Sequence, residues 1–455
     1  MTTRGSLTGE TVELLQQLIR NQCVNDNTPE GGQEVRSATL LRDELDGLGL
    51  DIELLEEIAG RTSVVARYEG TDPDAPALCL MGHTDVVPVS PDGWDNDPFG
   101  GELITTSDGV TEVWGRGAVD MLNVTSSMLV AFREVVRSGR RLSGDLIFFG
   151  VADEEAGGLH GAMPIVTDNW DAVKCDYVIT EYGGTPSHGP NGTTILLTTG
   201  EKGLAGRKLV VHGTPSHGSM SYATDNALVK AAEIVRRLSG SDVGPRIDEM
   251  FADRIRALGL TAEQEAGLLD PGRFEDTLTE LPPDLARNTH SCCHVTINPN
   301  VLRSGEKGNT VPDRAELYID IRTLPGDTQA DIDALVANLI GPDLMPSVEI
   351  NRPYPNMADG TLFSSTDTPL WDAMVDSIRM AYPSARVVPS LVTGGTDARY
   401  FRRRGVEAYG AGLLSNNVSL AEFLNRFHGN NERIDVDSLE LTTQLWLDIF
   451  DRLWN

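Results

Sequence analysis

The chain has 455 residues, 40% of them hydrophobic, and its mean hydropathy of -0.20 is typical of a soluble globular protein. The length exceeds what one hydrophobic core usually supports, so two domains are expected. A formal charge of -31 at pH 7 disfavours binding to nucleic acids and anionic membranes, since both require a basic surface. No run approaches about 18 consecutive apolar residues, and the polar start Met1 to Gly5 is unlike a signal peptide, so we expect a cytoplasmic protein.

The first part of the chain alternates predicted helices and strands, which is typical of a parallel α/β sheet. Helices are predicted at Glu10–Asn21, Glu34–Leu48 and Gly117–Ser138. Strands are predicted at Ser63–Tyr68, Ala77–Met81, Asp145–Ala152 and Tyr177–Thr180, followed by a hairpin-like segment at Thr193–Thr199. Helix–strand alternation resumes from Thr368 and ends with an amphipathic helix at Ser438–Leu453.

A different pattern separates these two stretches. Its predicted elements are a strand at Leu204–Val211, a helix at Asn226–Leu238, strands at Cys293–Asn298 and Ala315–Ile321, a helix at Thr328–Leu339 and a strand at Ser347–Asn351. This order is that of a ferredoxin-like α+β domain. A charged insertion, partly helical and covering about 241–289, interrupts it. We therefore predict an α/β catalytic domain formed by 1–202 and 353–455, with a lid domain at 203–352.

Histidine and carboxylate side chains follow several of the predicted strands directly. His83 follows the strand that ends near Met81, the pair Glu154-Glu155 follows Ala152, and Glu181 follows Thr180. Ligands bind at the carboxyl ends of strands in an open α/β sheet, so these side chains should meet at one edge. Together with two further candidates, Asp120 and His428, they have the composition of a two-metal hydrolase site.

Four segments in the same order resemble a known family. They are Met81-Gly-His-Thr-Asp-Val-Val-Pro88, Trp94-Asp-Asn-Asp-Pro-Phe-Gly100, Gly115-Arg-Gly-Ala-Val-Asp-Met121 and Asp153-Glu-Glu155. The chain resembles, over nearly its whole length, the dizinc aminoacylase, succinyl-diaminopimelate desuccinylase and glutamate carboxypeptidase metallopeptidases. This resemblance implies hydrolysis of an amide or peptide bond next to a free carboxylate. The substrate would be a dipeptide, a short peptide C-terminus or an N-acyl amino acid.

The resemblance also implies a set of metal ligands for two zinc ions, with cobalt or manganese as possible substitutes. His83 and Glu181 would bind the first metal, Glu155 and His428 the second, and Asp120 would bridge them. Asp176 is the alternative to Glu181, but it begins its strand, whereas Glu181 ends it.

Two acidic residues are assigned roles in catalysis. Glu154 would be the general base that takes a proton from a metal-bridging water and passes it to the leaving nitrogen. We expect Glu154 and Glu155 to lie on an extended segment and to point to opposite sides. Asp85 would sit behind His83 and fix its ring. The alternatives are a solvated loop for the acidic pair and a turn cap for Asp85.

Other residues match the family's substrate-side positions. His217 matches a histidine that reaches across the cleft, Asn309 an asparagine beside it, and Arg322 an arginine that grips a substrate carboxylate. The segment Gly394, Gly395 and Thr396 resembles a substrate-binding glycine loop. Asn309 and Arg322 could instead satisfy turns and salt bridges. In dimeric relatives this histidine comes from the partner chain. Two alternatives are therefore open: a homodimer through the lid domain, or closure of the lid over the centre of its own chain.

One segment departs from the family pattern, and two alternatives remain. Met121-Leu122-Asn123 replaces the usual Met-Lys-Gly, which leaves the proposed ligands intact but makes substrate preference less certain. A non-catalytic binding protein on the same scaffold would have lost the base or a ligand, yet all are present. Cys292 and Cys293, between His290 and His294, suggest zinc, but we expect structural residues on a strand there.

Overall fold

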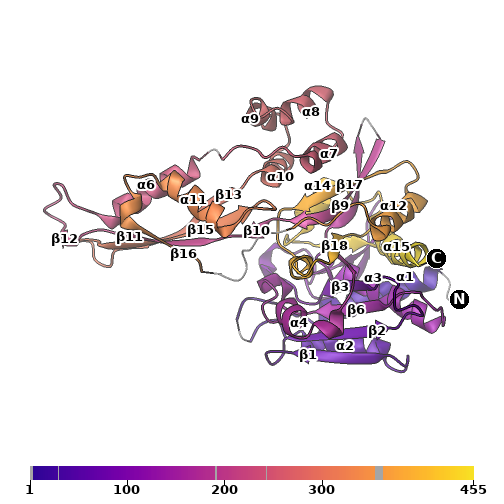
Figure 1. The fold of residues 1–455 in the computed structure, drawn as a ribbon. Coiled ribbons are helices and arrows are strands. Elements are labelled where there is room, and N and C mark those ends of the chain that lie inside the picture. Colours follow the sequence, from indigo (N-terminus) through magenta and orange to yellow (C-terminus); the bar gives the residue numbers. More distant parts are fainter. Residues whose placement is uncertain (1–3, 29, 190–191, 242, 354–361, 455) are drawn as a thin grey trace.

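The computed structural model describes residues 4–28, 30–189, 192–241, 243–353 and 362–454. These residues form a larger unit around a nine-stranded sheet and a smaller, elongated unit around a five-stranded sheet (Figure 1). Both chain ends lie on the larger unit (Figure 1). None of the helices within these ranges is long and apolar enough to cross a membrane.

The nine-stranded sheet has a parallel centre. Its strands, in spatial order, are β1 (Asp51–Glu56), β2 (Thr62–Tyr68), β6 (Leu146–Val151), β3 (Leu78–His83), β7 (Tyr177–Thr180), β18 (Glu407–Gly410), β9 (Gly192–Glu201) and β17 (Arg386–Val392), with β8 (Gly183–Gly189) paired to β9. The neighbours β6, β3, β7 and β18 run parallel, and β1 and β2 form an antiparallel edge. The hairpin predicted around Thr193–Thr199 is confirmed as β8 and β9.

Helices cover both faces of this sheet, so its central strands are apolar throughout. One face packs against α1 (Arg4–Arg20), α2 (Val35–Leu45), α3 (Leu122–Arg137), α12 (Pro369–Ala381) and α15 (Val436–Leu453). The other packs against α4 (Ala162–Asp168), α5 (Trp170–Val173) and α13 (Ala398–Arg402). Alternation along β3 and β6 divides the two cores: Leu80 and Phe148 face the first, Cys79 and Phe149 the second.

The smaller unit has the predicted ferredoxin-like topology. Its elements in chain order are β10 (Gly203–Leu204), β11 (Arg207–His212), β12 (Ser216–His217), α6 (Ala227–Ser239), β13 (Thr296–Ser304), β14 (Thr310–Val311), β15 (Arg314–Thr323), α11 (Gln329–Ile340) and β16 (Val348–Asn351). The long strands pair antiparallel in the order β16, β11, β15, β13. Residues of α6 and α11 share one core with the sheet.

The charged insertion is helical, as predicted, and has a small core of its own. Its helices are α7 (Glu249–Ala257), α8 (Ala262–Leu268), α9 (Phe274–Leu278) and α10 (Pro283–Cys293). The prediction of a strand from Cys293 was wrong, because α10 extends to that residue and β13 begins only at Thr296. The insertion also contacts the larger unit: Arg254 of α7 donates to Ser390 Oγ of β17 at 2.8 Å.

Two boundaries differ from prediction for physical reasons. Helix α3 begins at Leu122 rather than Gly117, because the Glu432 carboxylate accepts hydrogen bonds from the backbone amides of Gly117, Val119 and Asp120. Those amides hold a turn rather than a helix. A small sheet of β4 (Glu102–Thr105), β5 (Thr111–Trp114) and β19 (Arg433–Asp435), which the sequence did not predict, brings Glu432 to this turn, and α14 (Leu420–Arg426) precedes it.

Candidate metal centre

Three adjacent parallel strands deliver the predicted side chains to one sheet edge. His83 is the last residue of β3, Glu154 follows β6 and Glu181 follows β7. The strands β6, β3 and β7 are neighbours and run in the same direction, so their carboxyl ends meet. Asp176, the alternative ligand, lies at the start of β7 instead, where its carboxylate accepts a bond from the amide of Ala77 at 2.8 Å.

Two groups of possible ligands share Asp120. His83 Nε2 is 3.2 Å from Asp120 Oδ1 and 3.7 Å from Glu181 Oε2. His428 Nε2 is 3.1 Å from Asp120 Oδ2 and 3.4 Å from Glu155 Oε2. Within each group the possible ligand atoms all lie within 4.8 Å of one another. Asp120 thus presents one oxygen to each histidine, which is the arrangement of a bridging carboxylate.

The electrostatics of this edge fit cations. Burial, together with the charge of Asp120, raises the pKa of both Glu155 and Glu181. One oxygen of each carboxylate, Glu155 Oε1 and Glu181 Oε2, is buried and makes no hydrogen bond within the described residues. Hydrogen bonds to Asp120 and Glu155 raise the pKa of His428 to about 10. Carboxylate oxygens and imidazole nitrogens crowded in this way are a donor set suited to divalent metal ions.

The orientation of the His83 ring is fixed by a backbone carbonyl. Its Nδ1 is 3.0 Å from the Asp85 carbonyl oxygen, which can only accept, so Nδ1 carries the proton and Nε2 faces Asp120. The Asp85 carboxylate was expected to do this but lies farther off, at 3.6 Å. It accepts hydrogen bonds from the amides of Glu154 and Glu155 at 3.3 and 3.1 Å. Asp85 therefore positions the acidic pair.

The acidic pair lies on a turn, so the predicted extended segment was wrong. Asp153 has φ 70°, in the left-handed region, and Glu154–Ala156 form one 3-10 turn. Glu155 faces His428, whereas burial and the charge of Glu181 raise the pKa of Glu154 well above its usual value.

Several residues near the centre were missed by the sequence analysis. Asn25 Nδ2 donates to Asp85 at 2.9 Å. The Tyr182 hydroxyl lies 3.5 Å from Asp120 Oδ2, and its ring stacks on Phe427 at 5.0 Å. Asp397 is buried, its carboxylate oxygens make no hydrogen bond within the described ranges, and burial raises its pKa to about 7. Only Asp397 had a sequence signal, because it follows the predicted glycine loop.

The glycine loop itself contributes backbone rather than side chains. Gly394 lines a pocket together with His428. Thr396 is buried and donates through its hydroxyl to Glu201 Oε2 at 2.6 Å, and Gly395 packs close to Arg399. Thr396 thus anchors the loop and does not face the pocket.

That pocket, of about 480 Å³, adjoins the second ligand group. Its lining includes Tyr182, Gly394 and His428. Eight of the other residues that line it are apolar, namely Leu196, Leu285, Leu391, Val392, Leu420, Phe423, Leu424 and Phe427, and the polar ones include Arg254, Arg287 and Asn288. The insertion therefore forms part of the wall next to the candidate centre.

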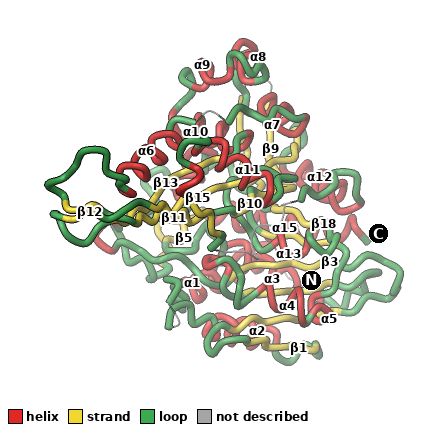
Figure 2. The backbone as a smooth tube through the Cα atoms, turned by 60° about the vertical axis from the view of Figure 1, so that its left-hand side comes forward, coloured by secondary structure: helices red, strands yellow, loops and turns green. Residues whose placement is uncertain are grey.

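The predicted site residues of the smaller unit lie at its two opposite ends. His217 on β12 and Asn309 beside β14 lie together at the end of the smaller unit that points away from the larger sheet (Figures 1 and 2). There the Asn309 carbonyl accepts from the Gly218 amide at 2.8 Å, and His217 is exposed. Arg322 lies at the opposite end of β15, paired with Leu204, near the larger unit. The structure does not bring His217 or Asn309 to His83 within one chain.

Arg322 forms the salt bridge that the sequence analysis had left open. Its Nε lies 2.8 Å from Asp320 Oδ1, and its side chain is 34% exposed. A substrate carboxylate would therefore have to compete with Asp320 for this guanidinium.

Two histidine–carboxylate groups that share an aspartate, at the carboxyl edge of an α/β sheet with an inserted α+β unit, define a metal-dependent hydrolase. The model of peptidase family M20/M25/M40 matches residues 79–452. The chain belongs to this family, which confirms the resemblance seen in the sequence.

Curated relatives agree with this assignment, and a solved structure shares the fold. The chain is 24% identical over 429 residues to aminoacylase-1 of Mus musculus, covering 94% of this chain and 91% of the relative. It is 25% identical over 405 residues to the N-fatty-acyl-amino acid synthase/hydrolase PM20D1 of Xenopus tropicalis, covering 86% and 75%. It shares the fold of the M20 metallo-carboxypeptidase Sso-CP2 of Sulfolobus solfataricus, with TM-score 0.70, 20% identity and 98% and 99% coverage.

Proposed function

We propose that the chain is a dinuclear metal amidohydrolase that cleaves an amide bond next to a free carboxylate. The observation that supports this proposal most directly is the placement of Asp120, one oxygen of which faces His83 and the other His428. A non-catalytic binding protein would have no need to retain Glu154 beside this centre, and no observation favours that alternative.

The proposed ligands would hold two divalent cations, most simply zinc, with His83 and Glu181 on one side, Glu155 and His428 on the other and Asp120 between them. When bound, the cations supply positive charge that polarises the scissile carbonyl and acidifies water. Asp85 would keep the Glu154–Glu155 turn in place through its two amide bonds.

Glu154 would transfer a proton from the attacking water to the leaving nitrogen. Its carboxylate would accept a proton from the attacking water and then donate it to the leaving nitrogen. Burial and the charge of Glu181 raise its pKa, which suits a group that must both accept and return a proton. Its position after β6 places it at the same sheet edge as the ligands.

We further propose that residues 203–352 act as a lid and that the chain works as a homodimer. His217 and Asn309 lie at the distal end of this unit, so a rotation of the lid about its junction would not readily bring them to the same chain's centre (Figures 1 and 2). A second copy could supply both as hydrogen-bond donors to the developing oxyanion. Arg322 would bind the substrate carboxylate only after leaving Asp320, because it lines the pocket beside His290 and His294 rather than the pocket beside His428.

The apolar pocket supports an N-acyl amino acid with an apolar acyl group as the preferred substrate. The pocket adjoins His428, and its lining includes Leu285 of α10 and Leu420, Phe423 and Leu424 of α14 beside the polar Arg254, Arg287 and Asn288. Each buried methylene of the acyl group would contribute about 0.8 kcal/mol to binding. The names of the mouse and Xenopus relatives point to the same class of substrate.

Metal removal and a substrate panel test this function. Zinc-loaded protein should hydrolyse N-acyl amino acids, with kcat/KM rising with acyl length, and should be slower on dipeptides of matched amino acid. A chelator should abolish activity, and added zinc should restore it. Hydrolysis that persists after complete metal removal would contradict the proposal, whereas a preference for dipeptides would overturn only the choice of substrate.

The pocket makes a separate prediction. Leu424→Glu should raise KM for long-chain acyl substrates by about tenfold and leave acetyl substrates nearly unchanged, since about two methylenes would lose apolar contact. Leu424 is 38% exposed, so the fold should tolerate the change. Met380→Glu is the matched control, because Met380 is an exposed apolar residue of α12 outside the pocket. Equal effects on short and long acyl substrates would contradict this placement.

A further inference from the structure

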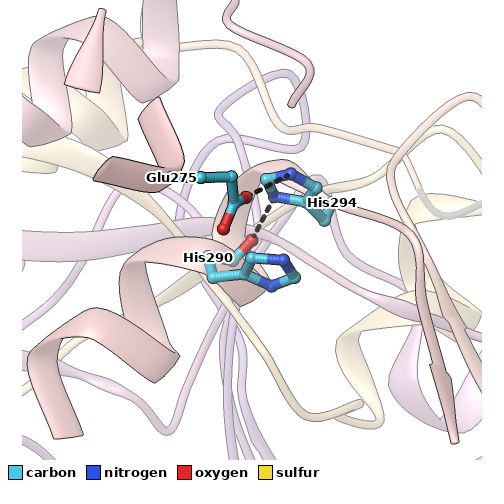
Figure 3. Close-up of side chains that lie close together, drawn as sticks. All are labelled: Glu275, His290 and His294. Atoms are coloured by element: carbon cyan, nitrogen blue, oxygen red, sulfur yellow. Dashed lines mark hydrogen bonds and ion pairs between the residues drawn. The ribbon is translucent and has the colours of Figure 1, made fainter. Parts of the chain in front are cut away.

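A second group of possible metal ligands lies in the insertion, apart from the catalytic centre. It consists of Glu275 on α9, His290 in the last turn of α10 and His294 directly after that helix (Figure 3). We propose that these three residues bind one divalent transition-metal ion, which fastens α9 to the carboxyl end of α10.

The local geometry places both imidazoles together. A spacing of four residues puts His290 and His294 on the same side of the chain as α10 ends. Their rings are stacked, with centroids 3.8 Å apart and planes 3° apart. Glu275 approaches from α9, and one possible ligand atom from each residue lies within 4.8 Å of the others (Figure 3). An ion must lie near the plane of each imidazole that binds it, and parallel stacked rings share no such position, so one of the two rings would have to turn out of the stack for both to coordinate a single ion.

The hydrogen bonding of His294 suits a metal ligand. Its Nδ1 lies 2.9 Å from the backbone carbonyl oxygen of His290, which can only accept, so Nδ1 carries the proton. In the neutral ring Nε2 then has a lone pair, and it faces Glu275 Oε1 at 3.9 Å. That distance is too long for a hydrogen bond. An ion about 2.0–2.2 Å from both atoms fits between them, and a carbonyl bound to the second ring nitrogen is usual for ligating histidines.

The cysteines between these histidines are not part of the site. Cys293 Sγ lies 3.2 Å from His294 Nδ1, on the side of the ring that faces the His290 carbonyl, and 3.5 Å from the carbonyl oxygens of Thr289 and His290, and Cys292 Sγ lies 3.8 Å from that of Leu391. Both cysteines are buried in the core of the insertion.

The surroundings favour a transition metal with an open position. The group borders a pocket of about 650 Å³ lined also by Asn298 and Arg322. Three protein ligands would leave room there for a water. Two imidazoles and one carboxylate suit zinc, cobalt, nickel or copper better than magnesium or calcium.

The ion would also stiffen the wall of the apolar pocket, because Leu285, Asn288 and Ser291 of α10 line that pocket. This consequence rests on the proposed function, whereas metal binding by the insertion does not.

Cobalt binding to the full-length chain tests the proposal. The protein used is a background variant with His83→Ala, Asp120→Asn and His428→Ala, in which three of the proposed catalytic ligands are absent. A chelator first removes any metal from this variant. We expect this background to retain one cobalt per chain, with the visible absorption of a low-coordinate ion. Adding His290→Gln should abolish that binding. Adding Glu275→Gln, an isosteric change at an exposed side chain, should weaken it by about tenfold.

His212→Gln in the same background is the matched control. His212 Nε2 also faces a carboxylate, Glu349 Oε1 at 2.9 Å, but belongs to none of the three-residue groups. Circular dichroism in chelator should show that all variants fold alike. The proposal is overturned if the background binds no cobalt at micromolar concentration, or if Glu275→Gln and His290→Gln bind cobalt as tightly as the His212 control. Neither result depends on whether the chain hydrolyses N-acyl amino acids.

Discussion

Glu154→Gln is expected to abolish measurable turnover while the protein keeps its catalytic metal ions. Glutamine preserves the shape of the side chain but cannot accept a proton, and general acid–base catalysis contributes about 10²–10⁴ to rate. Glu154 belongs to neither ligand group, so the change leaves His83, Asp120 and His428 in place. The measurements are kcat on the best N-acyl substrate and the metal content of the same preparation.

Glu155→Gln is the matched control for this prediction. The two residues are neighbours on one turn, and Asp85 binds both backbone amides. Glu155, however, faces His428 at 3.4 Å and belongs to the second ligand group. Its variant should lose metal as well as activity. If Glu154→Gln retained a tenth or more of the original kcat, or lost metal as Glu155→Gln does, the assignment of the base would be wrong.

Much of the centre could be predicted from the sequence because its residues follow the ends of buried strands. A buried parallel strand is an uninterrupted apolar run, as in Leu146–Val151, and the polar side chains that follow it within a few residues are visible in the sequence. Parallel neighbours bring such residues to one edge, which is why His83, Glu154 and Glu181 lie together. The roles of these residues stay predictions until variants are measured.

Contacts between distant segments could not be predicted in the same way. Glu432 lies more than 300 residues from the turn whose amides it binds, and nothing in the run Gly117–Met121 shows that its amides will find a carboxylate instead of a helix. Glu275 joins His290 and His294 only because α9 folds against α10. A single sequence does not specify which exposed carboxylate a helix packing will bring near a histidine.

The direction in which the smaller unit points could not be predicted from the sequence either. The topology of its strands follows from their order, and the structure confirms it. Whether His217 would reach its own centre depends on where β12 points, and that is set by packing at the junction between the units. The structure points β12 away from the larger sheet (Figure 1).

His217→Ala should lower kcat by about 10²–10³, the usual cost of losing an oxyanion donor. If the histidine comes from a second copy, an inactive His217→Ala chain should regain activity when mixed with an inactive Glu154→Gln chain. In the mixed dimer, the centre of the His217→Ala chain keeps its own Glu154 and receives His217 from the other chain. Random exchange makes half of the dimers mixed, each with one intact centre, so about a quarter of the original activity should return.

Mixing His428→Ala with Glu154→Gln provides the control, because both changes damage the centre of the chain that bears them. In that mixture no dimer has an intact centre, and activity should not return. Light scattering on each mixture should establish that dimers are present, and native mass spectrometry with one chain isotopically labelled should establish that they exchange. Recovery only in the His217 mixture would require His217 to act across the dimer, since no rearrangement within one chain can join an intact Glu154 to an intact His217 when each chain lacks one of them. Exchanging dimers without recovery would instead mean that the lid supplies this residue to its own centre.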